Sequence, residues 1–153
     1  MTEANKTLLN GKIEIPDLPT PSGNFVPAKI VDKIIYTSGQ TGKIKGVLKH
    51  RGRVGGEITI EEAYESAGLA CLNCLAQIKY VTGSLDSIDE IVDLLVFVSS
   101  TDDFYEQPKV ANGASDFLID LFGEKGRHTR AALGVKALPG NAPVEVKLVA
   151  KLK

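Results

Sequence analysis

The sequence has almost no charge excess and no long apolar run. Its 153 residues include 18 basic and 19 acidic side chains, which gives a formal net charge of −1. Proteins that bind nucleic acid through its backbone normally carry a basic surplus or a concentrated basic face, so the composition offers no case for such a partner. No apolar run approaches the roughly 18 residues of a membrane span, and residues 1–11 lack the apolar core of a signal peptide. We therefore expect a cytoplasmic protein that does not enter a membrane.

Cysteine is scarce, and no metal-ligand spacing is present. Cys71 and Cys74 are the only cysteines, so a disulfide framework does not hold the chain together. Their C-x-x-C spacing falls in the middle of an expected helix without a second cysteine pair, which favours packing over metal binding or redox chemistry. The two histidines, His50 and His128, are far apart in sequence. We expect no metal and no other cofactor.

The chain contains enough apolar residues for one compact core. Hydrophobic residues make up 43% and charged residues 24% of the sequence, which at this length predicts a single domain over residues 1–153. Pro16, Pro19 and Pro21 favour an extended N-terminal arm over residues 1–24.

Two strands and a long loop are predicted after the arm. Residues 25–31 and 33–38 are rich in β-branched and apolar residues and are predicted to form a hairpin that turns at Asp32. Residues 38–57 are rich in glycine and basic residues, which predicts a long loop that can include a short edge strand. Its GQTGKIKG run lacks the order of a phosphate-binding loop, and we discount that function.

Two helices flank a central strand. Thr59 and Glu62 have the spacing of a capping box, which predicts a helix that ends at Gly83. The near-continuous apolar run within residues 88–99 predicts a central strand covered on both faces. A second helix is predicted from Pro108 to Leu121.

The C-terminal segment, residues 128–150, carries one conspicuous charge in each of two predicted strands. Strict alternation over 130–137 and 144–150, with LPGN between them, predicts a hairpin in which Arg130 faces away from the apolar side. Ala132 and Gly134 share the side of Arg130 and are small, which would leave space for a ligand. In this register Glu145 can share a sheet face with Arg130.

These elements follow the order ββαβαββ. The uneven mixture of strands and helices predicts an α+β sandwich, with a mostly antiparallel sheet and both helices on one face. The second face needs another cover, and a neighbouring subunit there would place Arg130 and Glu145 at an interface.

The chain resembles the YjgF/RidA family over nearly its whole length. The segments that carry the resemblance are IIYTSGQ at 34–40, CLNCLAQIK in the first helix, VDLLVFVSS, QPKVANGASDFLIDLFGEKGRHTRAALGV at 107–135 and the terminal LPGNAPVEVKLVA. The resemblance implies a chorismate-mutase-like α+β fold and a homotrimer.

The resemblance also implies five site residues. Arg130 matches the family's pocket arginine, which in the active branch binds the carboxylate of a 2-imino or 2-enamino acid. Glu145 matches the pocket glutamate, which makes Arg130 and Glu145 the candidate catalytic residues. Three further residues are implied to bind substrate. Asn112 matches the family's helix asparagine, Phe25 matches an aromatic position that is often tyrosine, and Ser38 matches the serine before Gly39.

This sequence departs from the deaminases at several positions. Phe25 lacks the hydroxyl of a tyrosine, and Ala131 stands where many relatives have serine or threonine, so two polar contacts are lost and a drier pocket is expected. The basic loop at 43–53 also differs, and the sequence is closer to a less characterised branch of the family. Its KHRGR run is interpreted either as a solvated loop or as a patch for an anionic partner.

Three functions are compatible with these residues. The first is a hydrolase resembling a 2-iminobutanoate/2-iminopropanoate deaminase, with the substrate carboxylate on Arg130 and a water held by Glu145. The second is a trimer that binds or senses small carboxylates such as keto acids without catalysis. The third, RNA cleavage, is disfavoured by the near-neutral charge and the absence of a row of stacking aromatics. Structural roles also remain open, because Arg130 can be an interface ion-pair residue and Glu145 can pair with Lys147 or Lys136.

Overall fold

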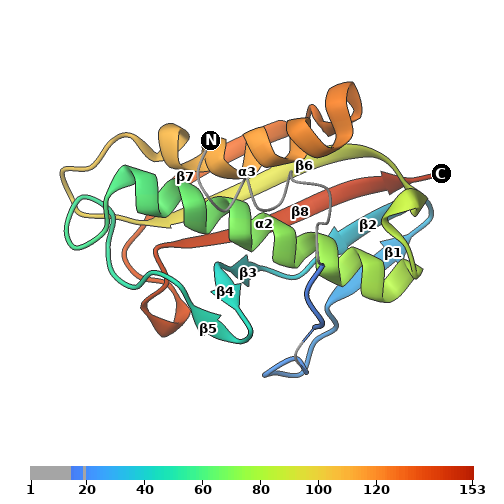
Figure 1. Cartoon of the computed structure of the whole chain (residues 1–153), viewed down its shortest axis with the longest axis horizontal. Coiled ribbons are helices and arrows are strands. Elements are labelled where there is room, and N and C mark those ends of the chain that lie inside the picture. The colour runs from blue at the N-terminus through green and yellow to red at the C-terminus, as the bar shows by residue number, and fades with distance from the viewer. Residues whose placement is uncertain (1–14, 19) are drawn as a thin grey trace.

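The described part of the chain folds into two layers. The computed structural model describes residues 15–18 and 20–153, which form a six-stranded sheet with two helices on one of its faces (Figure 1). The predicted α+β sandwich is therefore confirmed. Of the arm predicted over residues 1–24, positions 1–14 and 19 lie outside the described residues. None of the described helices is long and apolar enough to cross a membrane.

The main sheet has the strand order β1-β2-β8-β6-β7, and β3 pairs with one end of β8. The predicted N-terminal hairpin is confirmed, since β1 and β2 are antiparallel and turn at Asp32, whose φ is 53°. The predicted loop at 38–57 contains β3 and a separate β4–β5 hairpin. The strands are β1 (Ala28–Val31), β2 (Ile34–Thr37), β3 (Gln40–Thr41), β4 (Lys43–Ile44), β5 (Val47–Leu48), β6 (Ile88–Ser99), β7 (Thr129–Val135) and β8 (Val144–Leu152).

Both predicted helices are confirmed. Helix α2 (Ile60–Thr82) begins with the predicted capping box, in which the Glu62 amide donates to Thr59 Oγ1 over 3.2 Å and the Thr59 amide donates to Glu62 Oε2 over 2.9 Å. Helix α3 (Gln107–Phe122) crosses it closely, because a Cβ at Gly113 would lie only 1.9 Å from the carbonyl oxygen of Tyr64. Short 3₁₀ helices connect the larger elements: η1 (Leu85–Ser87), η2 (Gly123–Gly126) and η3 (Pro139–Asn141).

The core lies between the helices and the sheet. The inward face of α2 consists largely of small residues, which let the helix lie close to β6 and β8. Cys71 and Cys74 are both fully buried in this layer. Burial raises the pKa of the Cys74 thiol to about 12, so it stays protonated and packs as a small apolar residue.

The predicted C-terminal hairpin is wrong. Strands β7 and β8 do not pair with each other, because β6 lies between them, parallel to β7 and antiparallel to β8. The chain leaves β7, passes through η3 and enters the sheet on the other side of β6 (Figure 1). Alternation separated the two faces of each strand and assigned the core face of β8 correctly. On β7 the assignment was wrong, because Ala132 packs against the core and Leu133 is on the open face. Alternation also carries no information on which strands are neighbours.

Arg130 and Glu145 lie on opposite faces of the sheet, so the predicted shared face is also wrong. Arg130 is in register with Leu94, which is fully buried beneath the helices. Glu145 is in register with Phe97 and alternates with the buried Val144 and Val146, so it faces away from the helices. Arg130 therefore belongs to the helix side and Glu145 to the opposite side.

The face opposite the helices carries an apolar strip that no described element covers. Tyr36 on β2 is 44% exposed and Leu133 on β7 is 45% exposed, although both belong to the main sheet. By register the partly buried side chains of Leu95, Phe97 and Val149 lie on the same face. An exposed apolar strip of this kind is typical of an interaction surface.

Candidate functional site

The five predicted site residues form two groups that lie on opposite faces of the sheet. Phe25, Ser38 and Glu145 line one cavity on the face away from the helices. Arg130 and Asn112 are hydrogen-bonded to each other on the helix side. The structure therefore brings together two parts of the predicted site, but it does not join them within one chain.

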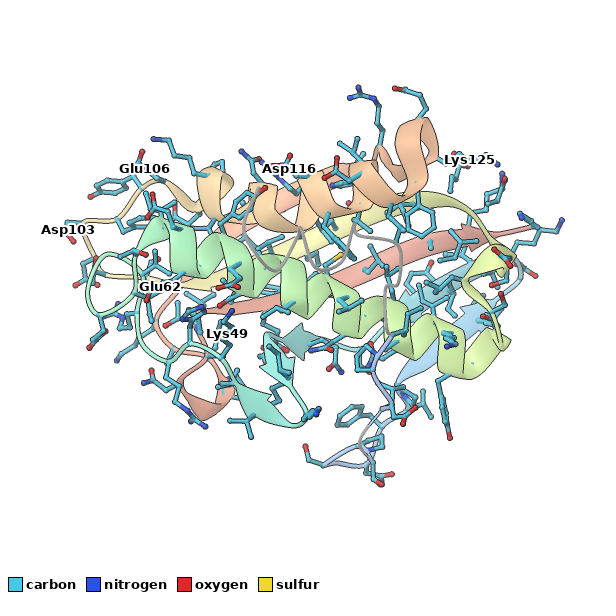
Figure 2. All side chains as sticks on the ribbon, in the orientation of Figure 1. Lys49, Glu62, Asp103, Glu106, Asp116 and Lys125 are labelled. Atoms are coloured by element: carbon cyan, nitrogen blue, oxygen red, sulfur yellow. The ribbon has the colours of Figure 1, made fainter. Side chains whose placement is uncertain are left out.

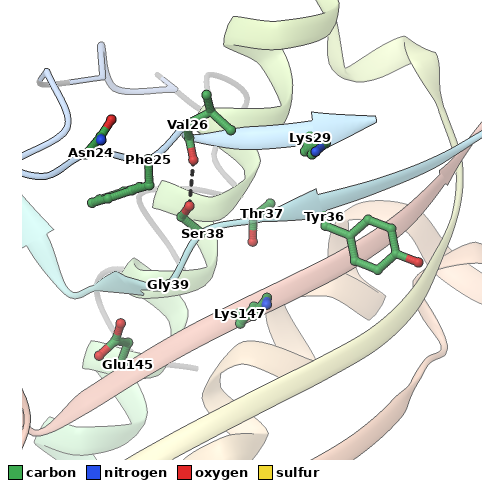
Figure 3. Close-up of a pocket in the computed structure, with 10 residues that line it drawn as sticks. All are labelled: Asn24, Phe25, Val26, Lys29, Tyr36, Thr37, Ser38, Gly39, Glu145 and Lys147. Carbon is green, nitrogen blue, oxygen red and sulfur yellow. Dashed lines mark hydrogen bonds between the residues drawn. The ribbon is translucent and has the colours of Figure 1, made fainter. Parts of the chain in front are cut away.

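The cavity holds the first group and has a volume of about 750 Å³. It lies where β1 and β2 approach the beginning of β8, and Figure 3 shows Glu145 and Gly39 at one end and Tyr36 at the other. The lining residues come from the end of the N-terminal arm, from β1, β2 and β8, and from the β2–β3 turn: Asn24, Phe25, Val26, Lys29, Tyr36, Thr37, Ser38, Gly39, Glu145 and Lys147.

Ser38 fixes the segment that carries Phe25. Its Oγ donates to the carbonyl oxygen of Val26 over 2.7 Å, and its amide donates to the carbonyl oxygen of Pro27 over 2.8 Å (Figure 3). The Phe25 side chain remains 52% exposed beside the cavity. Because the Ser38 proton is engaged by Val26, this hydroxyl is free to accept a hydrogen bond from a ligand but not to donate one.

Glu145 supplies a carboxylate that is free of partners. Among the described residues, neither Lys147 nor Lys136 nor any other side chain forms a hydrogen bond or ion pair with it. Burial raises the pKa of this half-buried carboxyl group above its usual value. A Cβ at Gly39 would lie 2.2 Å from Oε1, so glycine at this position leaves the room that the carboxylate occupies.

Arg130 supplies a guanidinium with one open edge. Its Nη1 donates to Asn112 Oδ1 over 2.9 Å and to Ser115 Oγ over 3.1 Å, and both acceptors belong to α3. Within residues 15–18 and 20–153 no carboxylate pairs with the guanidinium. Both bonds use the same nitrogen, so the adjacent Nε and Nη2 groups can donate two parallel hydrogen bonds to a carboxylate.

Two residues of this second group were missed by the sequence reasoning. Ser115 Oγ lies 2.9 Å from His128 Nε2, and His128 Nδ1 lies 2.6 Å from the carbonyl oxygen of Gly126. A signal was present, since Ser115 follows Asn112 by one helical turn and His128 precedes Arg130 by two strand positions. Those spacings place each residue beside a predicted site residue.

The predicted ligand space over Ala132 and Gly134 is not there. A Cβ at Gly134 would lie 2.9 Å from Gln107 Nε2, because the Gln107 side chain covers this glycine. Gln107 is fixed there by a 2.8 Å hydrogen bond to the carbonyl oxygen of Phe104. Ala132 packs against the core. The small residues of β7 thus admit α3 and the Gln107 side chain, which take the place that was predicted for a ligand.

The basic side chains of the loop at 43–53 that are described below form contacts within the same chain. Lys49 and His50 both contact Glu65 of α2, and Figure 2 shows Lys49 close to this helix. Arg51 Nη1 donates to the carbonyl oxygen of Gly140 over 2.9 Å, and Arg53 donates to the carbonyl oxygen of Ser100. The KHRGR run therefore fastens the loop to α2 and to the ends of the sheet.

In residues 15–18 and 20–153, no group of three or more histidine, cysteine, aspartate or glutamate side chains is arranged to hold a metal ion. The two predicted catalytic residues present a guanidinium on one sheet face and a carboxyl group with a raised pKa on the other.

The two-layer fold with an open sheet face places the protein among the small α+β proteins. A sequence model described as "YjgF/chorismate mutase-like, putative endoribonuclease" matches residues 5–152. The chain belongs to this YjgF family.

Three relatives are similar over most of their length. Protein TCP17 from Trypanosoma cruzi is 37% identical over 143 residues, which cover 92% of this chain and 88% of that protein. The crystal structure of Atu1372 from Agrobacterium tumefaciens, a protein of unknown function, has a TM-score of 0.82 at 38% identity. The match covers 85% of this chain and 83% of the Atu1372 chain. The crystal structure of a protein from Shewanella oneidensis, described as a "putative endoribonuclease", has a TM-score of 0.89 at 34% identity. The match covers 99% of this chain and 100% of that protein.

Proposed function

We propose that this protein hydrolyses reactive 2-enamino and 2-imino acids to 2-keto acids and ammonia, in pockets shared between subunits of a homotrimer. The observation that carries the proposal is the open edge of Arg130, whose Nη1 is fixed by Asn112 and Ser115 while Nε and Nη2 remain available. A planar guanidinium presented in this way matches a carboxylate with two parallel hydrogen bonds.

A second copy of the chain is needed to complete the pocket. Arg130 and Glu145 lie on opposite faces of one sheet, so a single chain cannot present both to one small substrate. The apolar strip around Phe97 and Leu133 gives a reason for association, because covering it removes apolar surface from water. In the assembly we propose, Arg130 of one subunit approaches the cavity that contains Glu145 of its neighbour.

The reaction needs one water molecule and one proton carrier. The substrate carboxylate binds to Arg130, and Glu145 accepts a proton from a water that adds to the C=N carbon. The protonated Glu145 gives this proton to the nitrogen, which yields a neutral carbinolamine. Glu145 then takes the proton of the carbinolamine hydroxyl and passes it to the amino nitrogen, the C–N bond breaks, and ammonia leaves as the C=O bond of the 2-keto acid forms. The raised pKa of Glu145 suits both steps, because a general acid and base works best when its pKa lies close to the pH of the reaction.

Substrates with an apolar side chain fit this pocket best. Phe25 has no hydroxyl, and the Ser38 hydroxyl has its proton engaged by Val26, so these two residues offer a substrate few hydrogen-bond donors. An acceptor group of a substrate side chain that lies beside Phe25 and Ser38 would lose its bonds to water without replacement from these two residues. We therefore propose small apolar 2-imino acids as the substrate class.

The proposal is tested by the release of ammonia and keto acid from freshly generated 2-aminoacrylate and from a bulkier 2-imino acid. We expect the wild-type protein to accelerate hydrolysis over the buffer reaction by about 10²- to 10⁴-fold, the usual contribution of general base catalysis and positioning. No acceleration, combined with measurable binding of 2-oxobutanoate, would instead identify a carboxylate sensor. Salt-dependent RNA binding with strand cleavage would favour a ribonuclease.

A further inference from the structure

Arg130 is the end of a four-member hydrogen-bond chain. The chain runs from the Gly126 carbonyl oxygen to His128 Nδ1 over 2.6 Å, from His128 Nε2 to Ser115 Oγ over 2.9 Å, and from Ser115 Oγ to Arg130 Nη1 over 3.1 Å. Its members come from η2, from the start of β7 and from the middle of α3. It therefore ties together the three elements that surround the guanidinium.

The chemistry of the two ends fixes the direction of every proton in the chain. A guanidinium can only donate, so Ser115 Oγ accepts from Arg130. A carbonyl oxygen can only accept, so His128 Nδ1 carries a proton and donates to Gly126. With a neutral imidazole, Nε2 is then an acceptor, and the Ser115 hydroxyl donates its proton to it. For the neutral imidazole, one arrangement satisfies all four groups, and it requires the Nδ1–H form of His128.

Two members of the chain, Gly126 and Ser115, are anchored to α3. Gly126 is buried, and a Cβ there would lie 2.3 Å from the carbonyl oxygen of Leu118, so η2 packs directly on the helix backbone. Ser115 is itself 8% exposed and belongs to α3. Because neither Gly126 nor Ser115 can move independently of α3, the chain fixes the position of Nη1 and thereby the orientation of the planar guanidinium.

We propose that Ser115 and His128 are positioning residues that hold the Nε and Nη2 edge of Arg130 ready for the substrate carboxylate. This inference rests on the proposed function, because it assumes that Arg130 binds a carboxylate. Neither residue touches the substrate. Their contribution is to lower the number of orientations that the long arginine side chain can adopt before the substrate arrives.

Ser115→Ala breaks the chain at its centre and leaves Arg130 with Asn112 alone. We expect KM to rise about tenfold and kcat to change by less than about twofold, since a carboxylate contact made equally in the ground and transition states affects binding alone. Ser115→Thr keeps the hydroxyl and should restore KM to within about twofold of wild type. A wild-type KM in Ser115→Ala would overturn the proposal.

A second experiment tests the chain without any turnover. Nitrogen-15 NMR of the imidazole rings distinguishes the two neutral forms of histidine, and His128→Gln identifies the signals because the sequence contains only two histidines. We expect the Nδ1–H form for His128 at neutral pH and a shift towards the other form in Ser115→Ala. The Nε2–H form in the wild type would overturn the proposal, because Nε2 could then not accept from Ser115.

The affinity for 2-oxobutanoate separates failure of this inference from failure of the proposed function. We expect the dissociation constant to rise about tenfold in Ser115→Ala and to recover in Ser115→Thr. Binding that is equal in wild type and Ser115→Ala contradicts the positioning role while leaving the deaminase function intact. No binding or turnover in the wild type, with His128 in the Nδ1–H form, contradicts the proposed function and with it the role of the chain.

Discussion

Arg130→Ala is expected to lower kcat/KM for 2-imino acid hydrolysis by roughly 30- to 5,000-fold. The range corresponds to the roughly 2–5 kcal/mol lost when one partner of a desolvated, hydrogen-bonded charge pair is removed. The affinity for 2-oxobutanoate should fall with it, because the same two hydrogen bonds hold substrate and product. Rates of ammonia release and a calorimetric binding curve measure the two effects.

Two variants serve as controls for Arg130→Ala. Arg130→Lys keeps the charge but cannot make two parallel bonds, so it should lose most of the activity. Arg127→Ala removes an exposed arginine three positions earlier that pairs with Glu124 on the surface, and it should behave as wild type. Thermal unfolding should change little in all three. Near-normal turnover in Arg130→Ala or Arg130→Lys would refute the mechanism.

Glu145→Gln is expected to lower kcat by about 10²- to 10⁴-fold while 2-oxobutanoate still binds. The amide can neither accept the proton of the attacking water nor return it to the nitrogen, whereas the carboxylate site on Arg130 is unchanged. Glu90→Gln is a matched control, because Glu90 is an exposed carboxylate of β6 and its partner Lys151 keeps Asp89. A kcat near the wild-type value in Glu145→Gln would remove Glu145 from the reaction.

The raised pKa of Glu145 should be visible in the pH dependence of both activity and stability. Burial raises its pKa above the ordinary value of 4.5, so the acid limb of the kcat/KM profile should lie above that pH. The pH dependence of stability runs in the opposite direction, because the folded protein favours the protonated form of Glu145. The stability that this group contributes is present below the pKa that it has in the unfolded chain. It is lost as the pH rises through the higher pKa of the folded state. Glu145→Gln should therefore be at least as stable as wild type at neutral pH.

Most of the architecture could be predicted from local signals in the sequence. The capping box at Thr59 and Glu62, the glycine after each helix and the apolar run of β6 each depend on neighbouring residues alone. These signals located both helices and the central strand. The order of strands in the sheet depends on contacts between distant segments, and for that reason the predicted pairing of β7 with β8 was wrong.

The candidate site was predictable residue by residue but not as an arrangement. The family resemblance selected Arg130 and Glu145, yet the assumed hairpin put them on one face. Ser115 and His128 escaped notice because a serine in a helix and a histidine before a strand have many ordinary roles. They became significant only when their distances to Arg130 and to each other were known.

The central claim, that each site combines Arg130 of one subunit with Glu145 of another, is tested most directly by subunit complementation. Arg130→Ala and Glu145→Gln chains, each inactive alone, would be co-expressed in equal amounts and purified as mixed oligomers through two different tags. In a trimer that contains both kinds of chain, one of the three sites receives both intact residues, whichever chain is present twice, because only one of the three neighbouring pairs has the required order. We predict that about one third of the wild-type activity returns. If activity stays at the level of the separate variants, both residues act within the same chain and the shared site is refuted.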